Sequence, residues 1–546
     1  MSNRTRGAIG AVLLGLGALW GAGALAEQHA PRPLLPPVVL PPSPPVEEEP
    51  APGGIRTEPL PAPSLATAGL ERPRFGFDEP LWPRAEGALV TALLERLRRL
   101  PPLPALRDLA RRLLIAPGPA VPDGLPVLMA RARALMRLGF PREAARLARL
   151  PGDEQSRLAR ERLALEALVL AGEVEEGCAL AETLAPDGRG LLALRVVCAA
   201  VAGELERARL IWAVARERGV VLDEASSALL DAAVGEAAVP LEGMSAESRL
   251  AALVAARRLP LRLEELPPEM WADGPLLAAL AENRKLAPAL RLRAAEAAAL
   301  RGWVAIPRLR ELMTELAGGA AEGEREVMDR ARTLAGLQAE RLPAPRVSLL
   351  AEAAAMVPAG VERVVWLHLL SVEAEPLVPD PALLWAAESV AAVLMAGGRW
   401  EQARPWLVLA GAVEDGDADG DPVLALLGRR RGEGAAPVRG RRLVYRLALA
   451  AAWDRNPADA ELAEALAAGP AEAAGAPGFG LWWVRERGLV ERRPGEALIA
   501  ALLMLEPPLE SLSPLVLTTA LRTLRAFGEE AAARELAAAV ALALRL

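Results

Sequence analysis

The sequence predicts an all-α protein built from repeated helical hairpins. Its 546 residues are 52% hydrophobic but only 3% aromatic, so Ala and Leu carry most of the apolar character. Both residues favour helices, and few stretches show the alternation of β-branched and polar residues that is typical of strands. The third observation is a recurring turn, in which a glycine ends one apolar stretch and a small residue stands five positions later.

The spacing of this turn indicates a repeat. Its five copies are Gly139 with Ala144, Gly172 with Gly177, Gly203 with Ala208, Gly398 with Ala403, and Gly528 with Ala533. Two further copies place proline at the second position: Gly235 with Pro240, and Gly302 with Pro307. Successive glycines from Gly139 to Gly235 are 33, 31 and 32 residues apart. A fixed period between about 20 and 50 residues is typical of repeat architectures.

Each position of the turn has a physical explanation. Glycine just past a helix end accepts the left-handed conformation without a Cβ clash. Acidic residues such as Glu204 and Glu206 then open the second helix, where the helix dipole favours them. We expect the small residue to lie where the paired helices approach most closely, because a larger side chain would push them apart.

At these two positions the chain resembles the tetratricopeptide repeat, a helix–turn–helix unit of about 34 residues. The resemblance is good over Pro126–Gly219 and fair over Pro381–Ala412 and Leu515–Leu546. It implies a right-handed superhelical array of antiparallel hairpins. It also implies protein or peptide binding on the concave surface, without catalysis.

The N-terminus predicts an exported protein. Arg4 and Arg6 precede an uncharged stretch that ends in the small-x-small motif Ala24-Leu25-Ala26, so we expect residues 1–26 to be a signal peptide. The alternative is an uncleaved anchor in the inner membrane that leaves the protein facing the periplasm. Residues 27–72 follow as a proline-rich linker, which is expected to be disordered. The expected location is therefore the periplasm or the medium.

A segment rich in Gly, Asp and Arg, residues 414–442, predicts a boundary between helical regions at 73–413 and 443–546. Asp415, Asp417, Asp419 and Asp421 alternate there as in the first half of a calcium loop. Leu426 occupies the position where a bidentate Glu is needed, so an acidic linker is the preferred interpretation and calcium, the one candidate cofactor, the alternative. The neighbouring Arg429, Arg430 and Arg431 are candidates for binding an anionic partner.

The only two cysteines predict a disulfide. Cys178 lies nine residues before Asp187, in the turn of one hairpin, and Cys198 lies eleven residues after it. Residues nearly equidistant from the turn of an antiparallel hairpin lie side by side, and an exported protein meets an oxidising compartment. The alternative is two buried free thiols, which behave as small apolar side chains.

Twelve tryptophans against one tyrosine and five phenylalanines are unusual. Our first interpretation is that they fill gaps between Ala-rich helices. The adjacent Trp482 and Trp483 point to different sides of any helix, so at least one is a candidate for ligand binding. Exposed tryptophans would favour a second function, the binding of carbohydrate or peptidoglycan.

No pattern predicts catalysis. The two histidines are His29, in the linker, and His368, alone among apolar residues. The net charge of −7 and the lack of a basic stripe with interleaved aromatics argue against nucleic-acid binding. The sequence therefore predicts a non-catalytic scaffold or adaptor for another envelope protein or peptide. The partner and the oligomeric state are left open.

Overall fold

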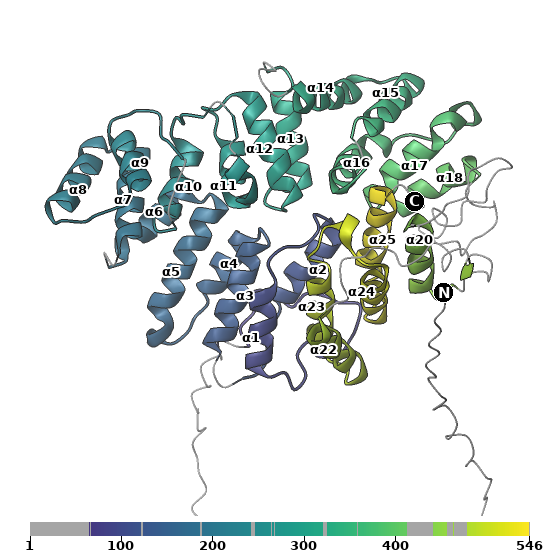
Figure 1. Ribbon diagram of the computed structural model, residues 1–546, viewed down its shortest axis with the longest axis horizontal. Helices are drawn as coiled ribbons and strands as arrows, with labels where there is room; N and C mark the ends of the chain where they lie inside the picture. Colours follow the sequence, from purple (N-terminus) through teal and green to yellow (C-terminus); the bar gives the residue numbers. More distant parts are fainter. Residues whose placement is uncertain are drawn as a thin grey trace, which may run out of the picture. The chain divides into compact units, whose positions relative to one another are not determined.

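The computed structural model is all-helical (Figure 1). It describes residues 65–544, except for 66, 122–123, 186–187, 242–245, 264, 267, 320–324, 358, 412–440, 456–461 and 464–477. In this part of the chain there are 23 α-helices, three short 3-10 helices and no strand. The predicted signal peptide, the calcium-loop aspartates and the arginines 429–431 lie outside the described residues.

Most of the helices follow one another with short connections, except between α18 and α20 and between α20 and α22. The first group is α1 (Gly87–Arg96), α2 (Pro104–Ile115), α3 (Leu125–Arg137), α4 (Pro141–Ala148), α5 (Glu154–Ala171), α6 (Val174–Thr183), α7 (Arg189–Val201), α8 (Leu205–Glu217), α9 (Glu224–Val234), α10 (Arg249–Arg258), η1 (Pro268–Ala272), α11 (Gly274–Glu282) and α12 (Pro288–Leu300). The second is α13 (Ile306–Leu316), α14 (Arg325–Ala339), α15 (Pro343–Ala355), α16 (Val361–Ala374), η2 (Pro381–Ala386), α17 (Ala387–Ala396), α18 (Trp400–Leu409), α20 (Arg441–Ala452), α22 (Phe479–Val490), α23 (Pro494–Met504), η3 (Leu509–Ser511), α24 (Pro514–Ala526) and α25 (Glu530–Leu544).

Consecutive helices pack against each other, as expected of helical repeats. The pairs α3–α4, α7–α8, α11–α12, α17–α18 and α22–α23 are in contact, as are most helices with the next along the chain. Their buried faces are dominated by Leu and Ala. Apolar burial of this kind is the main stabilising term in such an array.

The recurring glycine adopts the predicted backbone. Six of the seven turn glycines have positive φ, with values between 68° and 81°. Each closes its helix with the two hydrogen bonds of a Schellman motif; at Gly139, for example, the next N–H donates to the Leu135 carbonyl at 2.8 Å. The exception is Gly235, whose φ is −89°. No helix begins directly after it, because the chain there extends so that Val239 can bridge Leu261.

The small residue of the turn is buried in every one of the five full copies. The four alanines Ala144, Ala208, Ala403 and Ala533 have no exposed surface. At Gly177 an added Cβ would lie 3.2 Å from a methyl of Val169 on the preceding helix. The second position therefore lies where the helices pack closely, as predicted.

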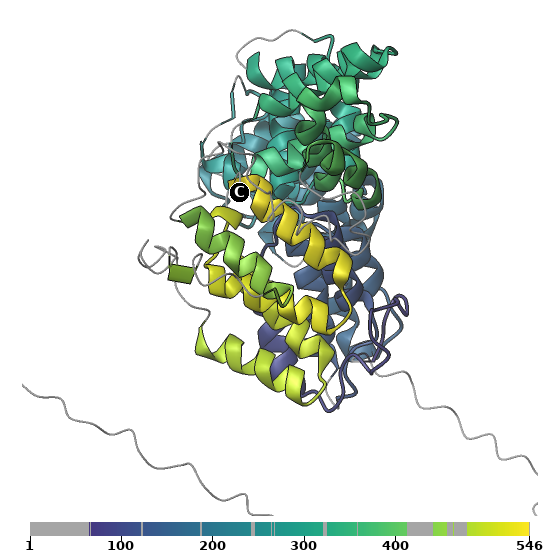
Figure 2. The same cartoon turned by 90° about the vertical axis from the view of Figure 1, so that its right-hand side faces the viewer.

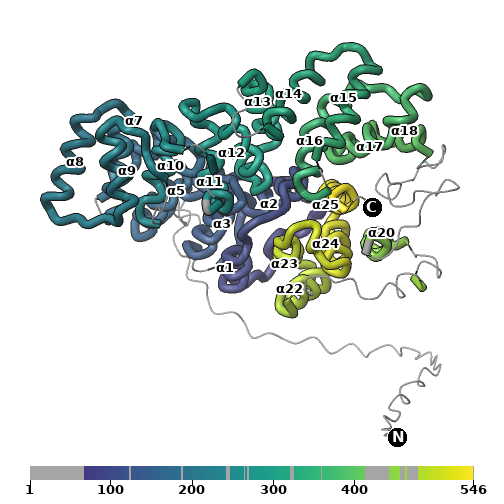
Figure 3. The backbone as a smooth tube through the Cα atoms, turned by 45° about the horizontal axis from the view of Figure 1, so that its top comes forward, coloured from purple at the N-terminus to yellow at the C-terminus, as the bar shows by residue number. Residues whose placement is uncertain are grey.

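The two ends of the described chain pack against each other, which no sequence pattern predicted. Helix α25 contacts α2 near the N-terminus and also α16 and α17. Helix α23 contacts α1 and α2. Figures 2 and 3 show these yellow helices beside the purple ones. The helices on either side of residues 412–440 thus share one core.

None of the described helices combines the length and the unbroken apolar run that a membrane span requires.

Candidate functional site

The predicted disulfide is present. Cys178 on α6 and Cys198 on α7 are bonded, with their Cα atoms 5.6 Å apart. Pro186 and Asp187 of the intervening turn lie outside the described residues, but the pairing of two positions nearly equidistant from it is confirmed.

The described tryptophans range from buried through half-buried to exposed. Trp212, Trp366 and Trp406 are buried, and the indole N–H groups of the first two donate to Asp231 and to the Ala353 carbonyl, both at 2.7 Å. These residues fill the core, as the first interpretation held. Trp482 and Trp483 on α22 are 39% and 56% exposed, so they lie at the surface.

No metal site is found in the part of the chain that the structure describes: it contains no group of three or more His, Cys, Asp or Glu side chains that could hold an ion. His368 belongs to α16, and its Nδ1 lies 2.8 Å from the Ala396 carbonyl oxygen. Burial lowers the pKa of His368, so the neutral ring is favoured.

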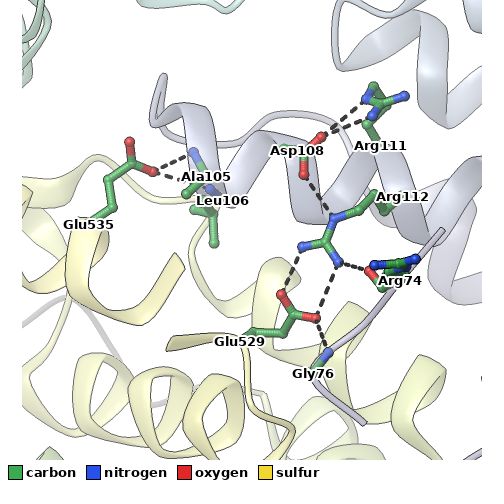
Figure 4. A network of polar contacts seen from close by, with 9 residues as sticks. All are labelled: Arg74, Gly76, Ala105, Leu106, Asp108, Arg111, Arg112, Glu529 and Glu535. Carbon is green, nitrogen blue, oxygen red and sulfur yellow. Dashed lines mark hydrogen bonds and ion pairs between the residues drawn. The ribbon is translucent and has the colours of Figure 1, made fainter. Parts of the chain in front are cut away.

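Two glutamate side chains at and near α25 bind residues close to the start of the described chain (Figure 4). The Glu529 side chain pairs with Arg112 of α2 at 2.8 Å and also accepts the backbone N–H of Gly76. Glu535 of α25 accepts two backbone N–H groups at the start of α2, those of Ala105 at 2.7 Å and Leu106 at 3.2 Å. Burial outweighs these bonds and raises the pKa of Glu535 to about 7.

The packing of the two ends creates an open cleft of about 850 Å³. Seven stretches of chain line it, namely residues 98–102 after α1, Arg137 of α3, Arg249 of α10, residues 272–275 at the start of α11, the end of α12 with Leu300, Arg301 and Trp303, Val361 of α16, and residues 506–509 before α24. A cavity of this size is within the range of ligand and peptide sites. Because its walls come from distant parts of the sequence, no local motif marks it.

The cleft is rich in arginine. Its lining includes Arg98, Arg99, Arg137, Arg249 and Arg301, against the two carboxylates Asp273 and Glu506. Apolar surface is supplied by Trp303 and by prolines at positions 101, 102, 275, 507 and 508.

Hydrogen bonds hold part of this lining in place. Arg137 donates to the Leu94 and Leu97 carbonyls at 2.7 and 2.9 Å. Glu506 accepts the Arg98 backbone N–H through its carboxylate, and its carbonyl accepts from Arg99 Nε at 2.9 Å. These contacts join the loop after α1 to the loop before α24, so the wall they form is well fixed.

Burial and the positive charges of the cleft lower the pKa values of two of its own arginines. Burial lowers the pKa of Arg301, and the neighbouring charge of Arg99 lowers it further. The pKa of Arg137 is lowered in the same way, by burial and then by Arg98. Guanidinium groups remain protonated in proteins despite such shifts, so the lining carries a concentrated positive charge.

The fold and the cleft define an all-helical protein of packed helix pairs with a cationic central cleft. Comparisons with family models, curated proteins and solved structures found no match.

Sequence reasoning did not identify this cleft. It selected Trp482 and Trp483, which are not among the cleft residues, and arginines 429–431, which lie outside the described residues. A weak sequence signal was present, because Arg98-Arg99-Leu100-Pro101-Pro102 and Glu506-Pro507-Pro508 both place a charged residue within two positions of a proline pair. Proline pairs end helices and force loops, and in this chain those two loops face each other.

Proposed function

We propose that this protein is a non-catalytic helical-repeat scaffold or adaptor that binds another protein or peptide in the central cleft. The observation that carries the proposal is the cleft itself, an open cavity of about 850 Å³ with mixed apolar and charged walls. Such walls suit a polypeptide, which presents both kinds of surface. The turn glycines and buried alanines support a relationship of architecture to tetratricopeptide repeats, whose units bind proteins in this way.

An exported location fits the proposed role. The Cys178–Cys198 bond supports it, since disulfides persist in oxidising compartments. We propose the periplasm or the medium, with an inner-membrane anchor formed by residues 1–26 as the alternative.

Photo-crosslinking tests the proposed binding site. A photoreactive amino acid at Pro507, an exposed position that lines the cleft, is compared with one at Leu210, which is exposed on α8 outside it. We expect a protein adduct in cells of the source organism from Pro507 and not from Leu210. Adducts that are identical at both positions, or no protein adduct at Pro507, would exclude the cleft as the binding site.

A second function, carbohydrate or peptidoglycan binding, is favoured by one observation. Phe479, Trp482 and Trp483 form an exposed aromatic cluster on α22, with ring centroids 5.9 to 6.4 Å apart. Flat aromatic surfaces combine apolar area with little conformational cost. Sedimentation with purified peptidoglycan tests this function. Binding by the full chain that is lost in a Trp482→Ala/Trp483→Ala variant and kept in Trp385→Ala, another exposed tryptophan, would support it.

A further inference from the structure

We propose that the ligand of the cleft is an acidic peptide segment, rich in Asp and Glu, of the partner protein. This inference rests on the proposed function and adds the chemistry of the partner. Charge complementarity is its basis, because the cleft lining has five arginines and only two carboxylates.

One of these carboxylates is already neutralised within the wall. Arg249 pairs with Asp273 at 3.2 Å. The other, Glu506, accepts a backbone N–H and the described residues give it no guanidinium partner for its carboxylate. Four arginines therefore remain against one acidic side chain.

Two of the four retain most of their donors. Within the described part of the chain, the Arg301 guanidinium donates one hydrogen bond, from Nη1 to the Ala297 carbonyl of α12, at 3.0 Å. The Arg98 side chain makes no ion pair with a carboxylate of the described residues, and its backbone N–H donates to Glu506. Each guanidinium can therefore still bind a carboxylate with two parallel hydrogen bonds.

The repulsion between these arginines is a cost that an anionic ligand would relieve. Arg99 acts on Arg301 and Arg98 acts on Arg137 across the cleft lining. A peptide with several carboxylates lowers this repulsion at several points at once, and recognition of acidic motifs by arginine clusters is a general mode of peptide binding. The prolines and Trp303 offer apolar surface for the peptide backbone and for side chains between the acids.

The test uses the full chain and a fluorescein-labelled oligoglutamate peptide, with an oligoglutamine peptide of the same length as the neutral probe. We expect anisotropy to show binding of the glutamate peptide alone. The affinity should weaken as salt rises from about 50 to about 500 mM, because salt screens charges in an open cleft.

The decisive variant is Arg98→Gln/Arg301→Gln. It removes two positive charges but leaves the contacts of Arg99 and Arg137 in the wall intact, so the fold should be retained, and its thermal melt is compared with that of the native chain. We expect its affinity for oligoglutamate to fall by about tenfold or more. The matched control is Arg146→Gln/Arg218→Gln, which removes two charges from exposed positions outside the cleft and should stay within about twofold of the native affinity.

Several outcomes would overturn the proposal. They are equal binding of the glutamate and glutamine peptides, no binding of either, an equal loss in the control variant, and tighter binding of a single-stranded oligonucleotide of the same charge in competition. A protein adduct at Pro507 together with any of these results would leave the scaffold function supported and the acidic partner excluded. The two proposals are therefore separable.

Discussion

Gly139 and Gly302 belong to two different copies of the recurring turn, and their backbones are in direct contact. A Cβ added to Gly139 would lie 2.4 Å from the Gly302 carbonyl oxygen. Arg107 of α2 joins the two turns, since its Nη2 donates to the Leu138 carbonyl at 2.6 Å and to the Gly302 carbonyl at 2.7 Å. Burial lowers the pKa of Arg107 to about 10. The turns thus connect distant parts of the array as well as neighbouring helices.

This contact predicts that the turn glycines differ in their tolerance of substitution. Gly302 and Gly203 both have positive φ, of 74° and 81°, so alanine should cost about 1 kcal/mol of conformational energy at either. An added Cβ at Gly302 would also collide with the Arg107 guanidinium, whereas at Gly203 it meets nothing within 4 Å. We expect Gly302→Ala to lower the unfolding free energy by about 3 kcal/mol in total. Urea denaturation checks this, and equal losses in the two variants would contradict it.

The disulfide should stabilise the hairpin of α6 and α7. It encloses a loop of 20 residues, for which the chain-entropy model gives about 3 kcal/mol. We expect Cys178→Ser/Cys198→Ser to lose about this amount in denaturation experiments. Reductant should destabilise the native chain by a similar amount and leave the variant unchanged. Two free thiols in oxidised protein by peptide mapping would be inconsistent with the bond.

The contact between Arg112 and Glu529 should be energetically coupled. Their side chains are 18% and 7% exposed, so removal of one partner leaves the other charge poorly solvated. In a double-mutant cycle with Arg112→Met and Glu529→Gln we expect a coupling energy of about 1 to 3 kcal/mol. The control is the pair Arg142–Glu173, whose side chains are 73% and 41% exposed, and whose coupling should be about 0.5 kcal/mol or less. Equal coupling energies for the two pairs would show that the Arg112–Glu529 contact contributes no more than an exposed ion pair does.

Glu535 should make stability depend on pH. Its pKa is about 7 in the folded chain, against an ordinary value of 4.5. Between these values the folded state binds a proton that the unfolded state has lost, so the unfolding free energy falls as pH rises from about 4.5 to 7 and changes no further above that. The total effect is at most about 3 kcal/mol.

The variant Glu535→Gln isolates this effect. Its side-chain carbonyl can still accept the N–H groups of Ala105 and Leu106, but it does not ionise. Relative to the native chain, the variant should therefore gain stability between pH 5 and pH 8 in urea denaturation. Glu401→Gln, at an exposed position on α18, provides the control. A constant difference between Glu535→Gln and the native chain across this range would show that Glu535 does not titrate there.

The sequence predicted the features that depend on local spacing. The positive φ of Gly139, the burial of Ala144 and the bond between Cys178 and Cys198 each follow from residues within one hairpin. Contacts such as Glu535 with Leu106 join residues 429 positions apart. A carboxylate that caps a distant helix is indistinguishable in sequence from one exposed to solvent.

The cleft was missed for the same reason. Arg98, Arg301 and Glu506 become neighbours only when the loops after α1 and before α24 meet the end of α12. Each of these residues looks like an ordinary surface charge in its own segment. Their common role depends on tertiary packing that hydrophobic periodicity does not describe.

The position of Glu535 also limits how many hairpins can lie between α2 and α25. In open helical-repeat arrays each unit touches only its neighbours, so evolution lengthens or shortens them by duplicating or deleting units. Here the final helix must reach the first residues of α2 while it also contacts α16 and α17. A duplicated hairpin between α3 and α16 would change the distance that α25 has to bridge. Descendants of this chain should therefore diverge by substitution and in loop length, while the number of hairpins between α3 and α16 stays constant.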